Sequence, residues 1–402
     1  MNSSKSLTTN TFISLICLLF VLSGAHAQQL PPTQTPYFQY SKGLEMTAPD
    51  SLFKMNIRFR MQNRFAFHSP FYEDRLGLDQ IEARIRRLRL RLDGFIYSSK
   101  LTYVIQLSFT RGDMDYDVTQ FPNIIRDAMV IYQFSEKFSM GLGQTKLPGN
   151  RQRVNSSGDL QLPDRSIVNA AFNIDRDFGI QAYYVENRFV LRGAISTGEG
   201  RNILSTDPGL AYTVRGEVLP FGHFSNGGDY FEGDLMREKS PKVSLGITYS
   251  YNNNTLRSGG QLGYYLYERR DIETRMADLL FKFNGFSLSA EYIERNSSDP
   301  LTFSSENELR YVSAGKGKNF QMGYLLPSNL ELVGRFSRLV PFPEIRFLEE
   351  EVSEFTIGLN KYLKGHRVKL QSDITLQNLN SFQNGSHNKR QVITRFQIEV
   401  GI

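Results

Sequence analysis

The feature that most constrains this chain is a strict alternation of apolar and polar residues that begins just after Leu52. The apolar parity carries Phe53, Met55, Ile57, Phe59, Met61, Phe65 and Phe67, interrupted once by Asn63. The other parity carries Lys54, Asn56, Arg58, Arg60, Gln62 and Arg64. Because successive side chains of a strand point to opposite faces, this period of two predicts a long β-strand with one apolar and one water-facing side. A strand of this length can cross a bilayer at a tilt.

Segments with the same alternation recur along the chain, separated by turn residues. Clear copies lie at 101–110, 242–251, 367–377 and 391–402, and fainter ones near 124–134, 137–147, 177–196, 210–218, 273–294, 320–338 and 352–362. No stretch keeps a helical period long enough for a helical domain. The segments give about 16 strand candidates, which predicts an all-β fold: a transmembrane antiparallel β-barrel over residues 51–402.

The connections between the expected strands differ in length. Asn284-Gly285 and Lys364-Gly365 are typical of short turns, whereas 148–175, 220–241 and 296–310 are long polar loops. Short turns at one end and long loops at the other are typical of a membrane barrel.

The N-terminal residues are typical of an export signal. Lys5 supplies the charged region, Phe12 to Leu22 is an apolar stretch too short to span a bilayer, and Ala25-His26-Ala27 is a cleavage motif. We therefore expect a signal peptide at 1–27, a periplasmic lead-in at 28–50 and a barrel in the outer membrane of a Gram-negative bacterium. The sole cysteine, Cys17, would be removed with the signal, so neither disulfides nor thiolate metal sites are expected.

The composition agrees with a barrel and leaves one alternative open. A mean hydropathy of −0.36 does not exclude the membrane, because only alternate residues of a barrel face lipid. The 30 Phe and 20 Tyr suit interfacial girdles, although Trp is absent. A soluble β-sandwich or surface adhesin also has alternating strands, but its strands are usually about 5–6 residues long. The Arg and Lys on the polar parity also favour a wet barrel interior.

The densest charge cluster is the segment 84–91, which holds five Arg among eight residues: Arg84, Arg86, Arg87, Arg89 and Arg91. The parity changes at Arg86-Arg87, which predicts a β-bulge that keeps both side chains on the polar face. Consecutive strands usually pair, so Arg58, Arg60 and Arg64 of the preceding strand would extend this cluster into a ladder of about eight Arg. Such ladders line anion channels, because clustered cations on a low-dielectric wall raise the local anion concentration.

Three other interpretations of the Arg cluster stay open at this stage. A nucleic-acid patch is disfavoured by export. The cluster could instead bind lipopolysaccharide on the outer leaflet. The third alternative is neutralisation by acids on facing strands, for which Glu82, Asp93, Asp113, Asp115 and Asp117 are available.

Several short motifs, in this order, resemble the phosphate-selective porins O and P. They are Arg111-Gly112-Asp113-Met114-Asp115, Arg126-Asp127-Ala128-Met129, Gly143-Gln144-Thr145-Lys146-Leu147-Pro148, Ser156-Ser157, Asp164-Arg165-Ser166 and the segment Ser196 to Asn202. The resemblance implies a 16-stranded, commonly trimeric barrel with an inward constriction loop, here near 148–170. It would place Lys146, Arg151, Arg153 and Arg165 near the narrowest point. Members differ in substrate, so a general or organic-solute porin remains an alternative to phosphate selectivity.

No motif indicates an enzyme. The four histidines after the signal (His68, His223, His366 and His387) lie in no known catalytic spacing, and neither G-x-S-x-G nor H-E-x-x-H occurs. We expect no catalytic residues, no metal and no cofactor. The expected partners are outer-membrane lipid and lipopolysaccharide, small anions such as phosphate, and further copies of the chain in a homotrimer; no nucleic acid is expected.

Overall fold

The computed structural model describes residues 37–402 except 41–42, 50, 73–74, 204–207 and 384–387. The predicted signal peptide lies outside the described residues, as does most of the predicted lead-in. No helix in the described part of the chain is long and apolar enough to span a bilayer.

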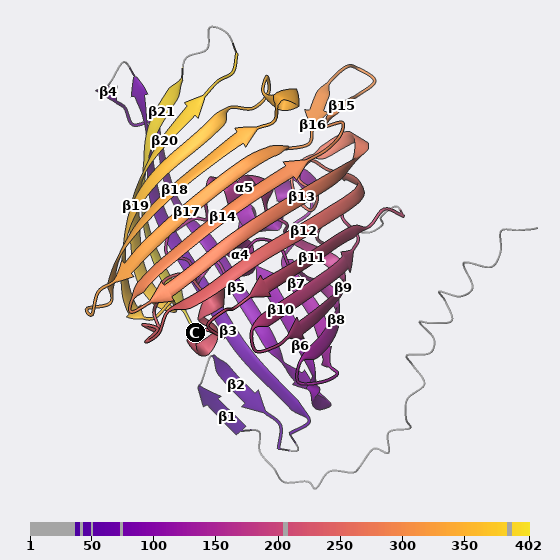
Figure 1. The fold of residues 1–402 in the computed structure, drawn as a ribbon, viewed down its shortest axis with the longest axis vertical. Helices are drawn as coiled ribbons and strands as arrows, with labels where there is room; N and C mark the ends of the chain where they lie inside the picture. Colours follow the sequence, from indigo (N-terminus) through magenta and orange to yellow (C-terminus); the bar gives the residue numbers. More distant parts are fainter. Residues whose placement is uncertain (1–36, 41–42, 50, 73–74, 204–207, 384–387) are drawn as a thin grey trace, which may run out of the picture. The chain divides into compact units, whose positions relative to one another are not determined.

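Sixteen antiparallel strands follow one another around a closed barrel, because β21 pairs with β3 (Figure 1). Their bounds are β3 (Phe53–Tyr72), β5 (Gln80–Ile96), β6 (Ser98–Ser108), β7 (Ile125–Gln133), β8 (Phe138–Lys146), β9 (Arg176–Val185), β10 (Phe189–Ser196), β11 (Ala211–Val218), β12 (Lys242–Arg257), β13 (Tyr265–Phe283), β14 (Phe286–Asn296), β17 (Gly315–Leu325), β18 (Leu330–Pro341), β19 (Glu351–Lys364), β20 (Val368–Asn380) and β21 (Lys389–Gly401). The predicted fold class is confirmed.

Short strands and helices lie in the connections and in the segment before β3. The strands are β1 (Tyr37–Tyr40), β2 (Leu44–Thr47), β4 (Arg75–Leu76), β15 (Leu301–Phe303) and β16 (Leu309–Tyr311). The helices are α2 (Arg111–Met114), α3 (Tyr116–Thr119), α4 (Arg151–Val154), α5 (Ile167–Phe172), η2 (Ser225–Tyr230) and η3 (Pro343–Ile345). β2 pairs with the start of β3 and so extends the wall beyond the end of β21.

The pairing of β3 with β5 confirms the predicted faces and the predicted bulge. Phe59 lies opposite Leu90 on the outward face, and Phe59 is 40% exposed. The register shifts beside Gln62, which lies opposite Arg87, so that Arg86 is the extra residue. Arg86 and Arg87 both approach Asp164 inside the barrel, at 3.2 and 3.8 Å. The bulge therefore keeps two successive guanidiniums on the inner face.

Cysteine labelling tests this assignment of faces. We expect a cysteine at Arg58 to react with a small hydrophilic thiol reagent in membranes, because Arg58 lines an inner cavity. A cysteine at the adjacent Ile57 should stay unlabelled, because its parity faces lipid. Cys17 should be replaced with Ser if the signal is retained. Equal labelling at the two positions would contradict the register, since a slip of one residue reverses every side chain.

Two connections fold into the barrel and contact its inner wall. Residues 147–175 join β8 to β9 and carry α4 and α5, which lie within the ring of strands in Figure 1. Inside the barrel, Val168 and Phe172 of α5 pack in an apolar cluster with wall residues Met276 and Ile293. The rest of the contact between this loop and the wall is mainly polar.

The second in-folded connection, residues 219–241, lies at the end of the barrel opposite to the one expected. Sequence analysis grouped it with the long loops. In the structure the backbone N–H of Asn284, in a short turn, donates to the carbonyl of Glu238 at 2.9 Å. The N–H of Gly285 donates to Asp234 at 2.7 Å. The length of a connection alone does not show at which end of the barrel it lies. That depends on whether an odd or an even number of strands precedes the connection.

A buried wall lysine holds each in-folded segment through backbone carbonyls. Lys282 on β13 is 1% exposed and Lys369 on β20 is 0% exposed. Lys282 donates to the carbonyls of Gly228, Phe231 and Gly233 at 2.6, 2.8 and 2.5 Å. Lys369 donates to the carbonyls of Gly158 and Leu160 at 2.8 and 2.6 Å. Both segments are therefore fixed by charge-assisted hydrogen bonds in a site shielded from water.

Candidate channel and its constriction

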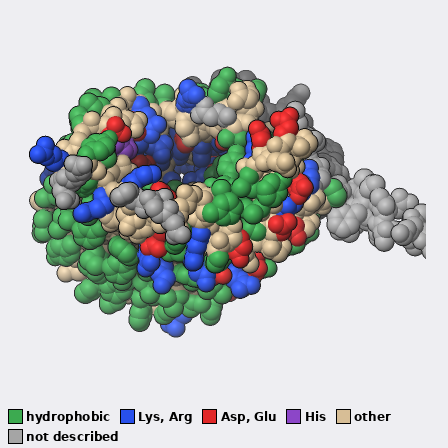
Figure 2. All heavy atoms as spheres, turned by 90° about the horizontal axis from the view of Figure 1, so that it is seen from above, with side chains coloured by type: hydrophobic (Ala, Val, Ile, Leu, Met, Phe, Trp, Pro, Cys, Tyr) green, Lys and Arg blue, Asp and Glu red, His purple; other side chains and the backbone are tan. Residues whose placement is uncertain are grey.

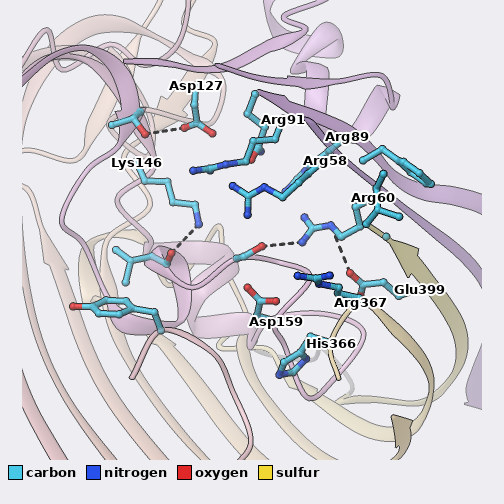
Figure 3. Close-up of a pocket in the computed structure, with 18 of the residues that line it drawn as sticks. Arg58, Arg60, Arg89, Arg91, Asp127, Lys146, Asp159, His366, Arg367 and Glu399 are labelled. Carbon is cyan, nitrogen blue, oxygen red and sulfur yellow. Dashed lines mark hydrogen bonds and ion pairs between the residues drawn. The ribbon is translucent and has the colours of Figure 1, made fainter. Parts of the chain in front are cut away.

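Two cavities inside the barrel meet at three cationic side chains. One has a volume of about 550 Å³ and the other about 430 Å³. Arg89, Lys146 and Arg176 line both cavities, so they form the waist between them. Figure 2 looks into the hollow from the long-loop end and shows Lys and Arg side chains at its depth, with an apolar outer wall around it. In Figure 3, Lys146 faces Arg58 and Arg60 across the larger cavity.

Cations outnumber acids around both cavities. Seven Lys and Arg side chains and three Asp and Glu side chains line the larger cavity. Ten Lys and Arg and five Asp and Glu line the smaller one. Positive potential in a cavity with low-dielectric walls attracts and concentrates anions.

The predicted Arg ladder lies on the inner face and is partly neutralised. Four acids neutralise it, and each of them forms ion pairs with two or more Arg side chains. Asp93 pairs with Arg58 and Arg91, Glu82 with Arg64 and Arg84, Asp113 with Arg89 and Arg126, and Asp164 with Arg64, Arg86, Arg87 and Arg395. Asp115 pairs elsewhere, with Arg257 at 2.8 Å, and the side chain of Asp117 is outside the described part of the structure. Because each of these four acids is shared by several Arg, the cluster keeps an excess of positive charge. The Arg side chains also point into the barrel, which argues against lipopolysaccharide as their partner.

Asp164 joins the in-folded loop 147–175 to the Arg ladder. Burial alone would raise the pKa of its carboxyl, but Arg86, Arg64 and Arg87 hold that pKa well below its ordinary value of 3.8. The stabilisation from this carboxylate is therefore complete above pH 3.8 and is lost only as the pH falls through the lower folded-state value. The loop stays tied to the ladder at neutral pH.

The Ser-Ser motif forms a second connection between the loop and the ladder. Arg60 donates to the hydroxyls of Ser156 and Ser157 at 2.8 and 2.9 Å. Arg89 donates to Ser157 at 2.7 Å. Neutral hydroxyls orient the guanidiniums without cancelling their charge, which explains serine at these positions.

Lys146 and Arg165 are bound by backbone carbonyls instead of by acids. Lys146 donates to the carbonyls of Val154 and Asn155, both at 2.9 Å. Arg165 donates to those of Gln152 and Asn155 at 2.7 and 2.9 Å. Within the described residues, neither cation forms an ion pair. No carboxylate in contact therefore offsets the charge of either cation in the cavities that they line.

Arg151 does not lie at the narrowest point, where the resemblance had placed it. Its side chain is directed to the wall across the barrel and donates to Asp278 at 2.8 Å, Glu217 at 3.0 Å and Ser244 at 2.7 Å. It is 3% exposed and lines neither large cavity. Arg153, by contrast, lines the smaller cavity and donates to Asp175 at 2.9 Å.

Sequence analysis missed several cations around the cavities: Arg126, Arg176, Arg201, Arg367 and Arg395. Arg176 lies opposite Lys146 in the pairing of β8 with β9. Its position as the first residue of the strand after the constriction loop is the signal that could have revealed it. Arg201 follows Gly198 and Gly200, whose φ values are +86° and +95°. These glycines permit the turn that brings Arg201 to the carbonyls of Asn123 and Asp113, at 3.2 and 3.0 Å.

The sequence of this chain matches a known protein family. A sequence model of the family described as "Phosphate-selective porin O and P" matches residues 55–255, half of the chain. An uncharacterized protein of Aquifex aeolicus (strain VF5) is 22% identical over 354 residues, which cover 78% of this chain and 80% of that protein.

Solved porin structures share the fold. The outer membrane channel DcaP of Acinetobacter baumannii has a TM-score of 0.53 and 14% identity, with 86% of this chain and 96% of that chain covered. An anion-selective porin from Comamonas acidovorans has a TM-score of 0.51 and 14% identity, with 86% and 99% covered. Identities this low establish the fold alone. The family match shows that this chain belongs to the phosphate-selective porin O and P family and is an outer-membrane porin.

Proposed function

We propose that this porin is an anion-preferring diffusion channel, in which solutes pass the waist formed by Arg89, Lys146 and Arg176. The observation that carries the proposal is the excess of cations around both cavities, with Lys146 bound only by carbonyls. Three of the sequence-predicted residues, Arg64, Arg84 and Arg151, line neither cavity and would support the path from outside. The other predicted residues line it: Arg58, Arg60, Arg86, Arg87, Arg89, Arg91, Lys146, Arg153 and Arg165.

The chemistry of the cations suits oxyanions. A guanidinium stays charged and presents a planar set of donors that matches phosphate and carboxylate oxygens. The Nε atoms of Arg58 and Arg87 are buried and have no hydrogen-bond partner among the described residues. Both guanidiniums line the path that we propose for anions, Arg58 in the larger cavity and Arg87 in the smaller one. Cavities of about 430 and 550 Å³ also accommodate small organic anions, so phosphate is one substrate within a wider class.

Single-channel recording tests the proposal. Across a tenfold KCl gradient in a planar bilayer, we expect a reversal potential with the sign of chloride permeation. The preference should weaken with salt, because the Debye length falls from about 10 Å at 0.1 M to about 3 Å at 1 M. Millimolar phosphate should reduce the chloride current if oxyanions occupy the waist. Potassium selectivity would show that the acids outweigh the cations, and would overturn the proposal.

The assembly and export of the chain remain part of this proposal. The motif at 1–27 supports removal of a signal peptide, and the Pro-rich segment 28–50 supports a periplasmic lead-in. The family resemblance supports a homotrimer in a Gram-negative outer membrane. The absence of a catalytic motif supports a channel without enzyme activity.

A further inference from the structure

A group of cations also lies on the membrane-facing side of the barrel, away from the channel. On β17, Asn319 and Gln321 face inward and are buried, whereas Phe320 is 40% exposed on the outward parity. Lys316 and Lys318 share the parity of Phe320, so they point outward. On β3 and β5, by contrast, the outward parity carries apolar side chains such as those of Phe65 and Ile85.

Like charges meet across two strands in this group. Lys318 lies directly opposite Arg338 of β18, a position where like charges destabilise a sheet. Arg338 is bound by Glu351 at 2.8 Å, and Lys316 lies 3.6 Å from Glu294. Lys318 has no acid within ion-pair distance in the described part of the chain. An anion between Lys318 and Arg338 would therefore give Lys318 the partner that Glu351 already gives Arg338.

The residues below this pair form an apolar surface. In the register, Phe320 lies opposite Phe336, and Phe336 lies opposite Phe355 of β19. Phe336 and Phe355 are 46% and 52% exposed on the outer wall.

The cations lie near the long-loop end of the barrel wall. Lys316 and Lys318 are the second and fourth residues of β17, and Arg338 is three residues from the end of β18. The ends of the strands of a membrane barrel lie at the level of the bilayer interface. Long cationic side chains at this level extend towards lipid head groups.

We infer that Lys318 and Arg338, flanked by Lys316, bind a phosphate group of a phosphorylated outer-leaflet glycolipid such as lipopolysaccharide. The acyl chains of the lipid lie over Phe320, Phe336 and Phe355. Two cations on adjacent strands above an aromatic surface complement an anionic head group above apolar chains, and basic clusters at this depth recognise lipid phosphates. The site is independent of ion selectivity in the channel, because its side chains face away from the cavities.

Native mass spectrometry of the detergent-purified barrel with added lipid A tests the inference. We expect wild type to retain lipid A and the double variant Lys318→Gln/Arg338→Gln to bind it roughly tenfold or more weakly, as expected for the loss of two charged contacts. The variant Lys318→Arg/Arg338→Lys should bind like wild type. Dephosphorylated lipid A should bind wild type as weakly as phosphorylated lipid A binds the double variant.

Two controls distinguish binding of the lipid at this site from a general effect of surface charge and from binding of free anions. Lys361 lies on the outward face of β19 near the other end of the barrel, where it donates to the carbonyl of Ser328. Lys361→Gln removes this cation and should leave lipid A binding unchanged. Millimolar inorganic phosphate should not displace lipid A, which would distinguish a lipid site from a free-anion site. Heat-modifiable migration on gels confirms folding of each variant. Equal lipid A binding by wild type and the folded double variant, or equal binding of the two lipid A forms by wild type, would overturn the inference.

Discussion

Replacing Lys146 with Glu is expected to abolish the anion preference of the channel and to shift it towards cations. Lys146 lies at the waist and forms no ion pair in the described residues, so a passing ion is close to this side chain and not to a contacting carboxylate. Exchanging a positive for a negative charge about 4 Å from the ion changes its energy by about 2 kcal/mol even at the dielectric constant of water. That corresponds to about thirtyfold in the occupancy of each ion, lower for an anion and higher for a cation.

The measurement is the reversal potential in a KCl gradient, compared across matched variants. Lys146→Gln keeps an N–H donor for the carbonyls of Val154 and Asn155, and should give an intermediate value. Lys100→Glu makes the same charge change at an exposed site that lines neither cavity, and should leave the potential unchanged. An unchanged potential in folded Lys146→Glu would mean that ions do not pass this waist.

The inner and outer faces of the barrel could be predicted from sequence because alternation is a local property. Once Phe59 faces lipid, Arg58 and Arg60 must face inward, whatever the rest of the chain does. The bulge was predictable for the same reason, since Arg86-Arg87 interrupts the alternation within a single strand. The acids that could pair with the ladder were also visible in part, and Glu82, Asp93 and Asp113 do form ion pairs with it.

The contacts of the in-folded segments were beyond sequence reasoning because they are long-range. Arg151 and its partner Asp278 are 127 residues apart, and no local period connects them. The resemblance predicted an inward constriction loop near 148–170 but not the direction of each of its side chains. On an irregular loop neither a period of two nor one of 3.6 assigns a face. Arg153 consequently lines a cavity, whereas Arg151, two residues earlier, binds the wall.

Loss of Arg151 is expected to release the constriction loop from the far wall and widen the channel. Arg151 and Arg215 share Glu217 and Asp278 in a buried network of two cations and two acids. Replacing Arg151 with Met leaves one cation for two buried carboxylates. Removing one partner from a buried ion pair usually costs about 3–5 kcal/mol. The backbone hydrogen bonds of the strands do not involve Arg151, so the barrel should still assemble.

A second substitution separates charge balance from anchoring. Arg151→Met/Glu217→Gln leaves Arg215 with Asp278 and restores the balance of the network, so the temperature of gel-detected unfolding should return towards that of wild type. The loop would still lack its contact with the wall, so single-channel conductance should remain above wild type and the current should be noisier in both variants. Arg151→Lys keeps the charge and should lie between wild type and Arg151→Met in both measurements. If conductance instead returned to the wild-type value together with stability, the interaction of Lys369 with the carbonyls of Gly158 and Leu160 would be sufficient to hold the loop, and Arg151 would serve only to neutralise the wall.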